Sequence, residues 1–190
     1  LKEGRSDSES DSQPTNSELG EARVSTLPKA RAWLETKMRE ELFPLSQSRF
    51  GVPADDLCLY DALIIGYGCF GGGSRSQPVH RDASLLSLNV ALSPPSNYQG
   101  GGTYVEGVSD TPRIEMEQGS VMCHAGGAPH AGRGTTSGER WVLVLFCLDK
   151  NKPQLARRCH ALGERLKQQG DLNGAAEALQ AGLTVAPNDH

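Results

Sequence analysis

Residues 79–141 hold two histidines and one carboxylate whose spacing restricts the fold more than any other feature of the chain. His80 and Asp82 are separated by one residue, and alternate side chains of a β-strand point to the same face. These two side chains can therefore reach one point while Arg81 points away. His130 lies 50 residues after His80 and has to arrive from another strand. A closed or double-sheet β fold can bring all three together.

The surrounding residues read as short strands separated by turns. Residues 56–67 form an apolar run that predicts one buried strand. Residues 113–116 and 120–124, with a turn between them, predict a hairpin. Residues 85–92 alternate between an apolar face and a face of smaller and polar side chains that we expect to line a cavity: Leu86, Leu88, Val90 and Leu92 against Leu85, Ser87, Asn89 and Ala91. The pattern predicts a mainly β chain with the double-stranded β-helix of cupins and jelly rolls.

The three side chains have the chemistry of a metal centre. Two imidazoles and one carboxylate on one side of a metal ion leave adjacent coordination positions open, which is typical of non-haem Fe(II) oxygenases. None of these positions carries a cysteine, which argues against a structural zinc site. About three positions of an octahedron would stay free, enough for a bidentate 2-oxo acid and for dioxygen. We therefore predict that His80, Asp82 and His130 bind Fe(II).

Arg140 begins the apolar run of residues 141–146, ten residues after His130. A buried guanidinium needs an anion, and it can bind a carboxylate through two parallel hydrogen bonds. We expect Arg140 to hold the far carboxylate of 2-oxoglutarate. A carboxylate of the protein itself is the alternative anion, and Arg140 would then have a structural role.

Four segments carry a resemblance to a known family: residues 80–84 (His-Arg-Asp-Ala-Ser), 88–92 (Leu-Asn-Val-Ala-Leu), 98–102 and 130–140. They resemble the catalytic domain of the procollagen lysyl hydroxylases and, more broadly, the prolyl 4-hydroxylase-type Fe(II)/2-oxoglutarate dioxygenases. The resemblance implies an enzyme that hydroxylates a peptidyl side chain, lysyl before prolyl, and releases succinate and CO2. It also implies ascorbate as a reductant. Ala131 and Arg133 depart from the family pattern in a loop near the substrate.

The resemblance also implies roles for two further side chains. Asn89 matches an asparagine of the family's 2-oxoglutarate pocket, and the alternative is a hydrogen bond to a neighbouring strand. Tyr67 matches a tyrosine that faces the active site, where it would contact the co-substrate or simply pack. His124 competes with His130 as a metal ligand, but only His130 has the ten-residue offset to Arg140 that the family shows.

The composition is that of a chain with one core and a small appendage, with 190 residues, a formal net charge of −4 and 37% hydrophobic residues. No Lys/Arg-rich block is present, so nucleic acid is not an expected partner. No apolar run approaches the ~20 residues of a membrane span, and no signal peptide is visible, although a chain beginning with Leu1 is consistent with a fragment. The odd set of cysteines predicts free thiols and slightly favours the cytoplasm over the secretory pathway: Cys58, Cys69, Cys123, Cys147 and Cys159.

The chain divides into three predicted parts. Residues 1–22 are rich in Ser, Asp and Glu and are expected to form a disordered tail. Residues 23–150 form the dioxygenase domain, whose first helix begins at Pro28 and ends at Pro44. Residues 151–190 resemble a tetratricopeptide repeat, a helical hairpin that could bind a protein partner. One repeat cannot bury its own apolar face, so the hairpin packs onto the oxygenase or continues into further repeats.

Functions of different classes fit these features. The first is an active Fe(II)/2-oxoglutarate dioxygenase that acts on a protein or peptide. The second is a tetratricopeptide adaptor on a β scaffold whose site is vestigial, and a small-molecule 2-oxoglutarate oxygenase is a third. The complete set of His80, Asp82, His130 and Arg140 favours an active enzyme, because a vestigial site should have lost one of them.

Overall fold

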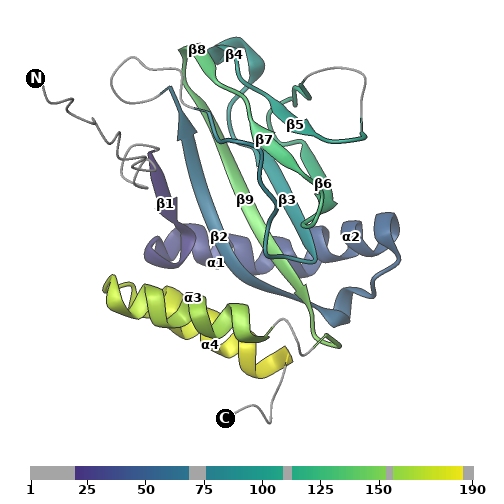
Figure 1. The fold of residues 1–190 in the computed structure, drawn as a ribbon, viewed down its shortest axis with the longest axis vertical. Helices are drawn as coiled ribbons and strands as arrows, with labels where there is room; N and C mark the ends of the chain where they lie inside the picture. Colours follow the sequence, from purple (N-terminus) through teal and green to yellow (C-terminus); the bar gives the residue numbers. More distant parts are fainter. Residues whose placement is uncertain (1–19, 69–75, 109–112, 153–155, 186–190) are drawn as a thin grey trace, which may run out of the picture.

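The computed structural model describes residues 20–68, 76–108, 113–152 and 156–185. Its main sheet has five antiparallel strands in the order β1-β2-β9-β3-β6 (Figure 1). The strands are β1 (Glu21–Arg23), β2 (Leu57–Tyr67), β3 (Leu86–Ala91), β6 (Val121–Ala125) and β9 (Arg140–Asp149). The register of β2 and β9 runs from Leu57 opposite Asp149 to Tyr67 opposite Arg140, so it places the last two side chains next to each other.

Four short strands form a second layer over one face of this sheet (Figure 1). Strand β4 (Tyr98–Gly100) pairs with β8 (Thr135–Gly138), and β5 (Thr103–Val105) pairs with β7 (His130–Gly132). The two layers make a double-stranded β-helix, which confirms the predicted fold class. His80, Asp82, His130 and Arg140 line a pocket between the two layers.

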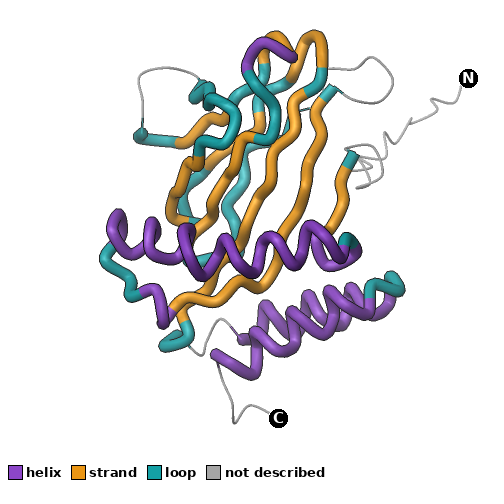
Figure 2. The backbone as a smooth tube through the Cα atoms, turned by 180° about the vertical axis from the view of Figure 1, so that it is seen from behind, coloured by secondary structure: helices purple, strands orange, loops and turns teal. Residues whose placement is uncertain are grey.

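The opposite face of the main sheet is covered by one long helical segment (Figure 2). It consists of α1 (Pro28–Lys37), a π-helical turn (Met38–Leu42) and α2 (Phe43–Phe50). The expected end at Pro44 is therefore wrong. Pro44 lies in the first turn of α2 directly after the π turn, where its missing N–H costs little. The segment ends instead at Gly51, whose φ of 70° forms a left-handed cap.

The main core lies between this helical segment and the sheet. Strand β3 alternates as predicted, because Leu86, Leu88 and Val90 belong to this core. The intervening Ser87 and Asn89 are buried on the other face of the strand, toward the candidate site. The remaining buried members of this core come from the helical segment, the neighbouring strands and the short turn after β1: Val24, Leu34, Met38, Leu42, Leu57, Ala62, Leu143, Leu145 and Cys147.

The C-terminal residues form a helical hairpin of α3 (Ala156–Gln168) and α4 (Leu172–Val185). Asp171 caps α4, since its Oδ1 accepts a hydrogen bond of 2.9 Å from the Gly174 N–H. The apolar faces of both helices pack against Tyr60 and Leu148 of the sheet and share a core with them. The hairpin thus packs onto the β domain. No helix in the described part of the chain is long and apolar enough to cross a membrane.

The predicted hairpin of residues 113–116 and 120–124 is wrong, because Ile114 forms an isolated bridge with Thr103 while β6 pairs with β3. The predicted disordered tail, residues 1–22, lies mostly outside the described residues, but β1 begins at Glu21 and is ordered against β2. The four described cysteines are free, as predicted, and Cys69 lies outside the described residues: Cys58, Cys123, Cys147 and Cys159.

Candidate metal centre and co-substrate pocket

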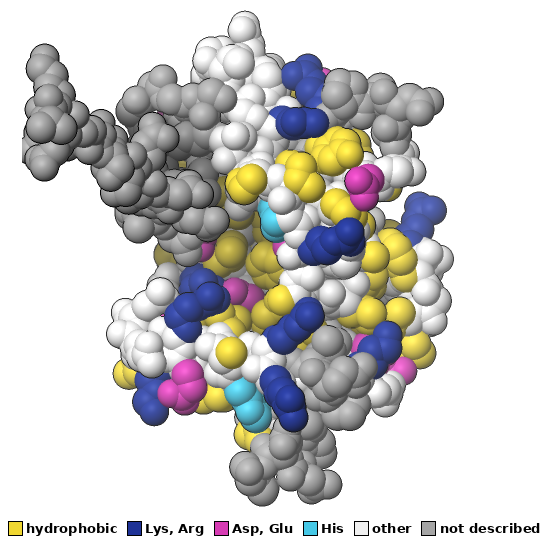
Figure 3. All heavy atoms as spheres, in the orientation of Figure 1, with side chains coloured by type: hydrophobic (Ala, Val, Ile, Leu, Met, Phe, Trp, Pro, Cys, Tyr) yellow, Lys and Arg dark blue, Asp and Glu magenta, His cyan; other side chains and the backbone are white. Residues whose placement is uncertain are grey.

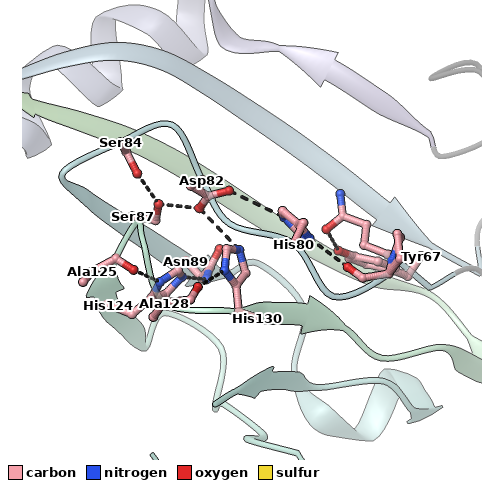
Figure 4. Close-up of polar contacts among 12 residues, drawn as sticks. Tyr67, His80, Asp82, Ser84, Ser87, Asn89, His124, Ala125, Ala128 and His130 are labelled. Carbon is pink, nitrogen blue, oxygen red and sulfur yellow. Dashed lines mark hydrogen bonds and ion pairs between the residues drawn. The ribbon is translucent and has the colours of Figure 1, made fainter. Parts of the chain in front are cut away.

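His80, Asp82 and His130 come together at one point (Figure 4). Each offers one possible ligand atom, and these atoms all lie within 4.8 Å of one another. The Nε2 atom of His80 is 3.5 Å from Asp82 Oδ1, and the Nε2 atom of His130 is 3.3 Å from Asp82 Oδ2. The carboxylate therefore faces both imidazoles.

The three side chains reach this point by a route that differs from the predicted one. His80 and His130 form a two-residue β-bridge, in which each N–H donates to the other's carbonyl at 2.9 Å. Their rings consequently lie 4.3 Å apart between centroids. Asp82 belongs to a loop before β3 and not to a strand that it shares with His80. The expectation of strand alternation at residues 80–82 is wrong, because the loop turns Asp82 back toward the bridge.

The backbone fixes which ring nitrogens face the carboxylate. The Nδ1 atom of His80 lies 2.8 Å from the carbonyl oxygen of Pro78, and that of His130 lies 3.0 Å from the carbonyl oxygen of Ala128. A carbonyl only accepts, so each Nδ1 carries the proton of the neutral ring. Each Nε2 then points a lone pair at Asp82. Three acceptor groups face one point, an arrangement that suits a bound cation.

A proton can take the place of a metal cation between these groups. When His80 is protonated at Nε2, its hydrogen bond to Asp82 raises the pKa of His80 in spite of partial burial. Burial opposes ionisation of the Asp82 carboxyl, but hydrogen bonds from His80 and Ser87 outweigh it and lower the pKa of that carboxyl. The carboxyl is therefore ionised near neutral pH. A His-His-Asp set of this kind fits Fe(II) by ligand type.

His124 lies beside this cluster but directs its Nε2 elsewhere. Its ring centroid is 4.4 Å from that of His130. Its Nδ1 lies 3.0 Å from the Ala125 carbonyl oxygen, and its Nε2 lies 3.4 Å from Asn89 Nδ2, which is the donor in that contact. Burial lowers the pKa of His124, so the ring is neutral. Among the described residues, the cluster with metal-ligand spacing includes His130 and leaves out His124.

Arg140 is a buried cation next to the cluster, with only 4% of its surface exposed. Its Nη2 donates to Thr103 Oγ1 at 3.1 Å, and its guanidinium carbon lies 4.9 Å from the centroid of the Tyr67 ring. No carboxylate of the described residues lies within ion-pair distance of it. Within the described part of the chain, its Nη1 has no hydrogen-bond partner, and neither has the buried hydroxyl of Thr135. Because an unpaired buried charge is costly, these groups suit an incoming anion.

Tyr67 and Asn89 line the same pocket as Asp82 and Arg140. The Tyr67 hydroxyl donates to Gln77 Oε1 at 3.1 Å, and burial raises the pKa of this phenol. Asn89 also contacts His124 on the neighbouring strand. Its position is therefore compatible both with a role in the co-substrate pocket and with a hydrogen bond between strands. The apolar part of the lining comes from β2 and β9: Leu63, Ile65, Val142, Val144 and Phe146. Figure 3 shows this face of the molecule hollowed between the strands and the C-terminal helices, with hydrophobic side chains in the hollow.

The sequence predicted one further polar side chain of the site and missed three. Ser87 was expected to line the cavity, because it alternates with Leu86 and Leu88 and shares a face with Asn89, and it does contact Asp82. Thr103 and Thr135 approach Arg140, and Gln77 approaches Tyr67, from other strands and loops. No local pattern marks them.

Known proteins with similar sequences include oxygenases, although no family model matches the chain. The mouse 2-oxoglutarate and iron-dependent oxygenase domain-containing protein 2 is 36% identical over 92 residues, which cover 45% of this chain and 25% of the mouse protein. A PKHD-type hydroxylase from Parvibaculum lavamentivorans is 29% identical over 120 residues, which cover 54% of this chain and 55% of that protein. The chain thus spans between a quarter and about half the length of these curated relatives.

A solved structure shares the fold. The oxidoreductase of the 2OG-Fe(II) oxygenase family from Burkholderia pseudomallei matches with a TM-score of 0.53 and 20% identity, covering 64% of this chain and 58% of that chain. At this identity the likeness shows the fold alone, and that fold is the double-stranded β-helix described above. The sequence matches and the shared fold therefore both point to 2-oxoglutarate- and Fe(II)-dependent oxygenases, to which this chain is similar over about half its length in sequence and in its double-stranded β-helix.

Proposed function

We propose that this chain is a hydroxylase that binds one Fe(II) through His80, Asp82 and His130 and binds 2-oxoglutarate beside it. The observation that carries the proposal is the meeting of three ligand atoms within 4.8 Å of one another next to a buried guanidinium. In the overall reaction one oxygen atom of O2 enters the substrate as a hydroxyl group and the other enters succinate. 2-Oxoglutarate loses CO2 and supplies two electrons.

The side chains fit the metal by their chemistry. Both imidazoles are held by backbone carbonyls so that their Nε2 lone pairs face the ionised carboxylate of Asp82. The bound metal would supply the binding and activation of O2 and a site for the 2-oxo group of the co-substrate. The protein's part is to hold the three ligands on one side, which leaves the remaining positions for co-substrate and O2.

Arg140 fits the far carboxylate of 2-oxoglutarate. Its unpartnered Nη1 and the unpartnered hydroxyl of Thr135 can both donate to one carboxylate, while Thr103 orients the guanidinium from the other side. The buried setting strengthens such charge-assisted hydrogen bonds. Tyr67 and Asn89 line the same pocket and complete our proposed co-substrate site.

The substrate we propose is a peptidyl side chain, lysyl before prolyl, on the strength of the segments that resemble the lysyl hydroxylases. Ascorbate is the proposed reductant for the same reason. The relatives named as PKHD-type hydroxylases support hydroxylation but do not specify the target. The apolar side chains of β2 and β9 beside the site offer a surface for such a substrate.

The proposed domain layout is an oxygenase domain of residues 23–150 and a tetratricopeptide-like hairpin of residues 151–190. The proposal is supported by the helical hairpin of α3 and α4, whose apolar faces pack on the sheet. The other face of the hairpin is the proposed surface for a protein partner.

The experiment is an incubation of the protein with Fe(II), 2-oxoglutarate, ascorbate and a library of lysine- and proline-containing peptides. Succinate formation measures co-substrate turnover, and mass spectrometry detects a peptide that gains one oxygen atom. We expect iron-dependent succinate and at least one hydroxylated peptide. Iron-dependent succinate with no modified peptide would redirect the search to small-molecule substrates, and the absence of iron-dependent succinate would refute the proposed activity.

A further inference from the structure

Two hydroxyl groups form a chain of hydrogen bonds that ends at the carboxylate of Asp82 (Figure 4). The Ser87 hydroxyl donates to Asp82 Oδ2 at 2.5 Å, and the hydroxyl oxygens of Ser84 and Ser87 lie 2.7 Å apart. We call Ser84 and Ser87 the serine pair. Ser87 is completely buried and Ser84 is 8% exposed, so water does not compete for these bonds.

The direction of the hydrogen bonds follows from the number of protons. An ionised carboxylate only accepts, so the single hydroxyl proton of Ser87 goes to Asp82. Ser87 therefore accepts from Ser84, which must be the donor in their contact. Both hydrogen bonds point toward the carboxylate, and a hydrogen bond to Ser87 makes its hydroxyl a stronger donor to Asp82.

The two ends of this chain differ in how firmly the backbone holds them. Ser87 lies on β3 between two partner strands, opposite His124 of β6 and Phe146 of β9. Asp82 lies in a loop. The backbone N–H of Asp82 donates a hydrogen bond to the Gly126 carbonyl at 2.8 Å. The carboxylate can still turn about its terminal bond, which has broad rotamer preferences. Ser87 is thus a fixed point next to a group that the backbone alone does not orient.

Gly126 shows that the loop is shaped around the serine pair. A Cβ atom added to Gly126 would collide with the backbone and hydroxyl of Ser84. Gly126 also donates its N–H to the Leu85 carbonyl at 2.9 Å, so the loop is tied to it on both sides of Ser84. The absence of a side chain at Gly126 lets Ser84 sit within reach of Ser87.

We propose that Ser87, assisted by Ser84, is a positioning residue that holds the Asp82 carboxylate turned toward both imidazoles and thereby sets the metal affinity of the site. This inference rests on the proposed function, because it takes His80, Asp82 and His130 as the metal ligands. Loss of a hydrogen bond that orients a ligand typically weakens metal binding by about ten- to a hundredfold. The same loss should fall mainly on affinity, because Ser87 does not touch the metal.

The test is calorimetric titration of Mn(II) alone into the full chain, without 2-oxoglutarate or O2. Ser87→Ala should weaken Mn(II) binding by about ten- to a hundredfold, whereas Ser87→Thr, which keeps the hydroxyl, should retain most of the affinity. Ser46→Ala is the matched control. Ser46 is also completely buried, and its hydroxyl donates to the Leu42 carbonyl in the helical segment on the other side of the sheet, so the substitution removes a buried hydrogen bond away from the site. Urea unfolding of each variant separates a loss of stability from a loss of affinity.

The two consecutive hydrogen bonds from Ser84 to Ser87 and from Ser87 to Asp82 form a relay. The combined effect of the two serine substitutions on Mn(II) affinity tests this relay, because a simple packing role would not produce it. Ser84→Ala should weaken Mn(II) binding less than Ser87→Ala does, and it should have almost no further effect once Ser87 is alanine, because the relay is already broken. Equal Mn(II) affinity in folded Ser87→Ala and wild type would overturn the positioning role and leave the proposed function standing. If Ser87→Ala does not fold, wild-type affinity in Ser84→Ala overturns the relay. A wild-type chain that binds no Mn(II) would overturn the proposed metal site and this inference together.

Discussion

The replacement of Arg140 by lysine separates a 2-oxoglutarate enzyme from other proteins with the same set of metal ligands. The change keeps the positive charge but removes the planar fork of the guanidinium. In the structure one arm of this fork donates to Thr103 Oγ1 at 3.1 Å, and Nη1 is left without a partner in the pocket. The free arm is the group that we expect to contact the co-substrate.

The size of the effect follows from the bonds at stake. A lysine ammonium can replace one charge-assisted hydrogen bond to the co-substrate carboxylate but not a parallel pair. Loss of one such bond costs about 1.5–3 kcal/mol, which corresponds to about a ten- to hundredfold weaker affinity for 2-oxoglutarate. Metal affinity should stay near the wild-type value, because Arg140 is not among the three clustered ligands.

Calorimetric titration of 2-oxoglutarate into the Mn(II)-loaded variant measures this effect. Arg133→Lys is the matched control, because Arg133 also lies over a tyrosine ring, with its guanidinium carbon 5.0 Å from the Tyr104 centroid, and is not among the residues that line the pocket. It should bind 2-oxoglutarate like wild type. Unchanged affinity in Arg140→Lys would show that Arg140 is structural and would refute its role in co-substrate binding.

Three further changes test other parts of the structure. Leu166 is 1% exposed in the hairpin core, so Leu166→Ala should lower the free energy of unfolding in urea by about 2–5 kcal/mol; no change would mean that the hairpin does not unfold with the rest. Gly101 has a φ of 69°, and an added Cβ would lie 3.1 Å from Arg140 Cδ, so Gly101→Ala should weaken 2-oxoglutarate binding in calorimetry; wild-type binding would show that Arg140 can adjust. Burial raises the pKa of Glu177 in the folded protein, so this group makes stability fall as pH rises from the unfolded pKa through the folded one. The free energy of unfolding of Glu177→Gln in urea, minus that of wild type, should therefore be higher at about pH 7 than at about pH 4. The same difference at both pH values would contradict the raised pKa.

The local parts of the fold were predictable from the sequence. The alternation in β3 follows from a period of two and separates Leu88, in the core, from Ser87 and Asn89, on the site face. Strand β2 was recognisable from its continuous apolar run. These patterns depend only on neighbouring residues, so no knowledge of the partner strands was needed.

The errors have physical causes. The segment around Pro44 continues as a helix because a π turn precedes the proline, and nothing in the local pattern signals that turn. Ile114 pairs with Thr103, and β6 pairs with β3, because strand pairing depends on long-range packing that a single sequence does not display.

The candidate site shows the same division between local and long-range information. The spacing of His80, Asp82 and His130 led to the prediction that they meet, and the structure places them together, but through a bridge and a loop and not through a shared strand. The hydrogen bond between Arg140 and Thr103, which are 37 residues apart in the sequence, arises only when separate strands are brought together in one pocket.

The central claim, one Fe(II) held by His80, Asp82 and His130, is tested most directly by Fe(II) titration under anaerobic conditions. Wild type should bind one Fe(II) per chain, and His130→Ala should lose this binding while its circular dichroism spectrum stays that of the folded protein. The control His160→Ala changes a histidine on α3, outside the cluster, and should bind like wild type. Undiminished Fe(II) binding in folded His130→Ala, together with its loss in His124→Ala, would contradict the claim and make His124 the ligand.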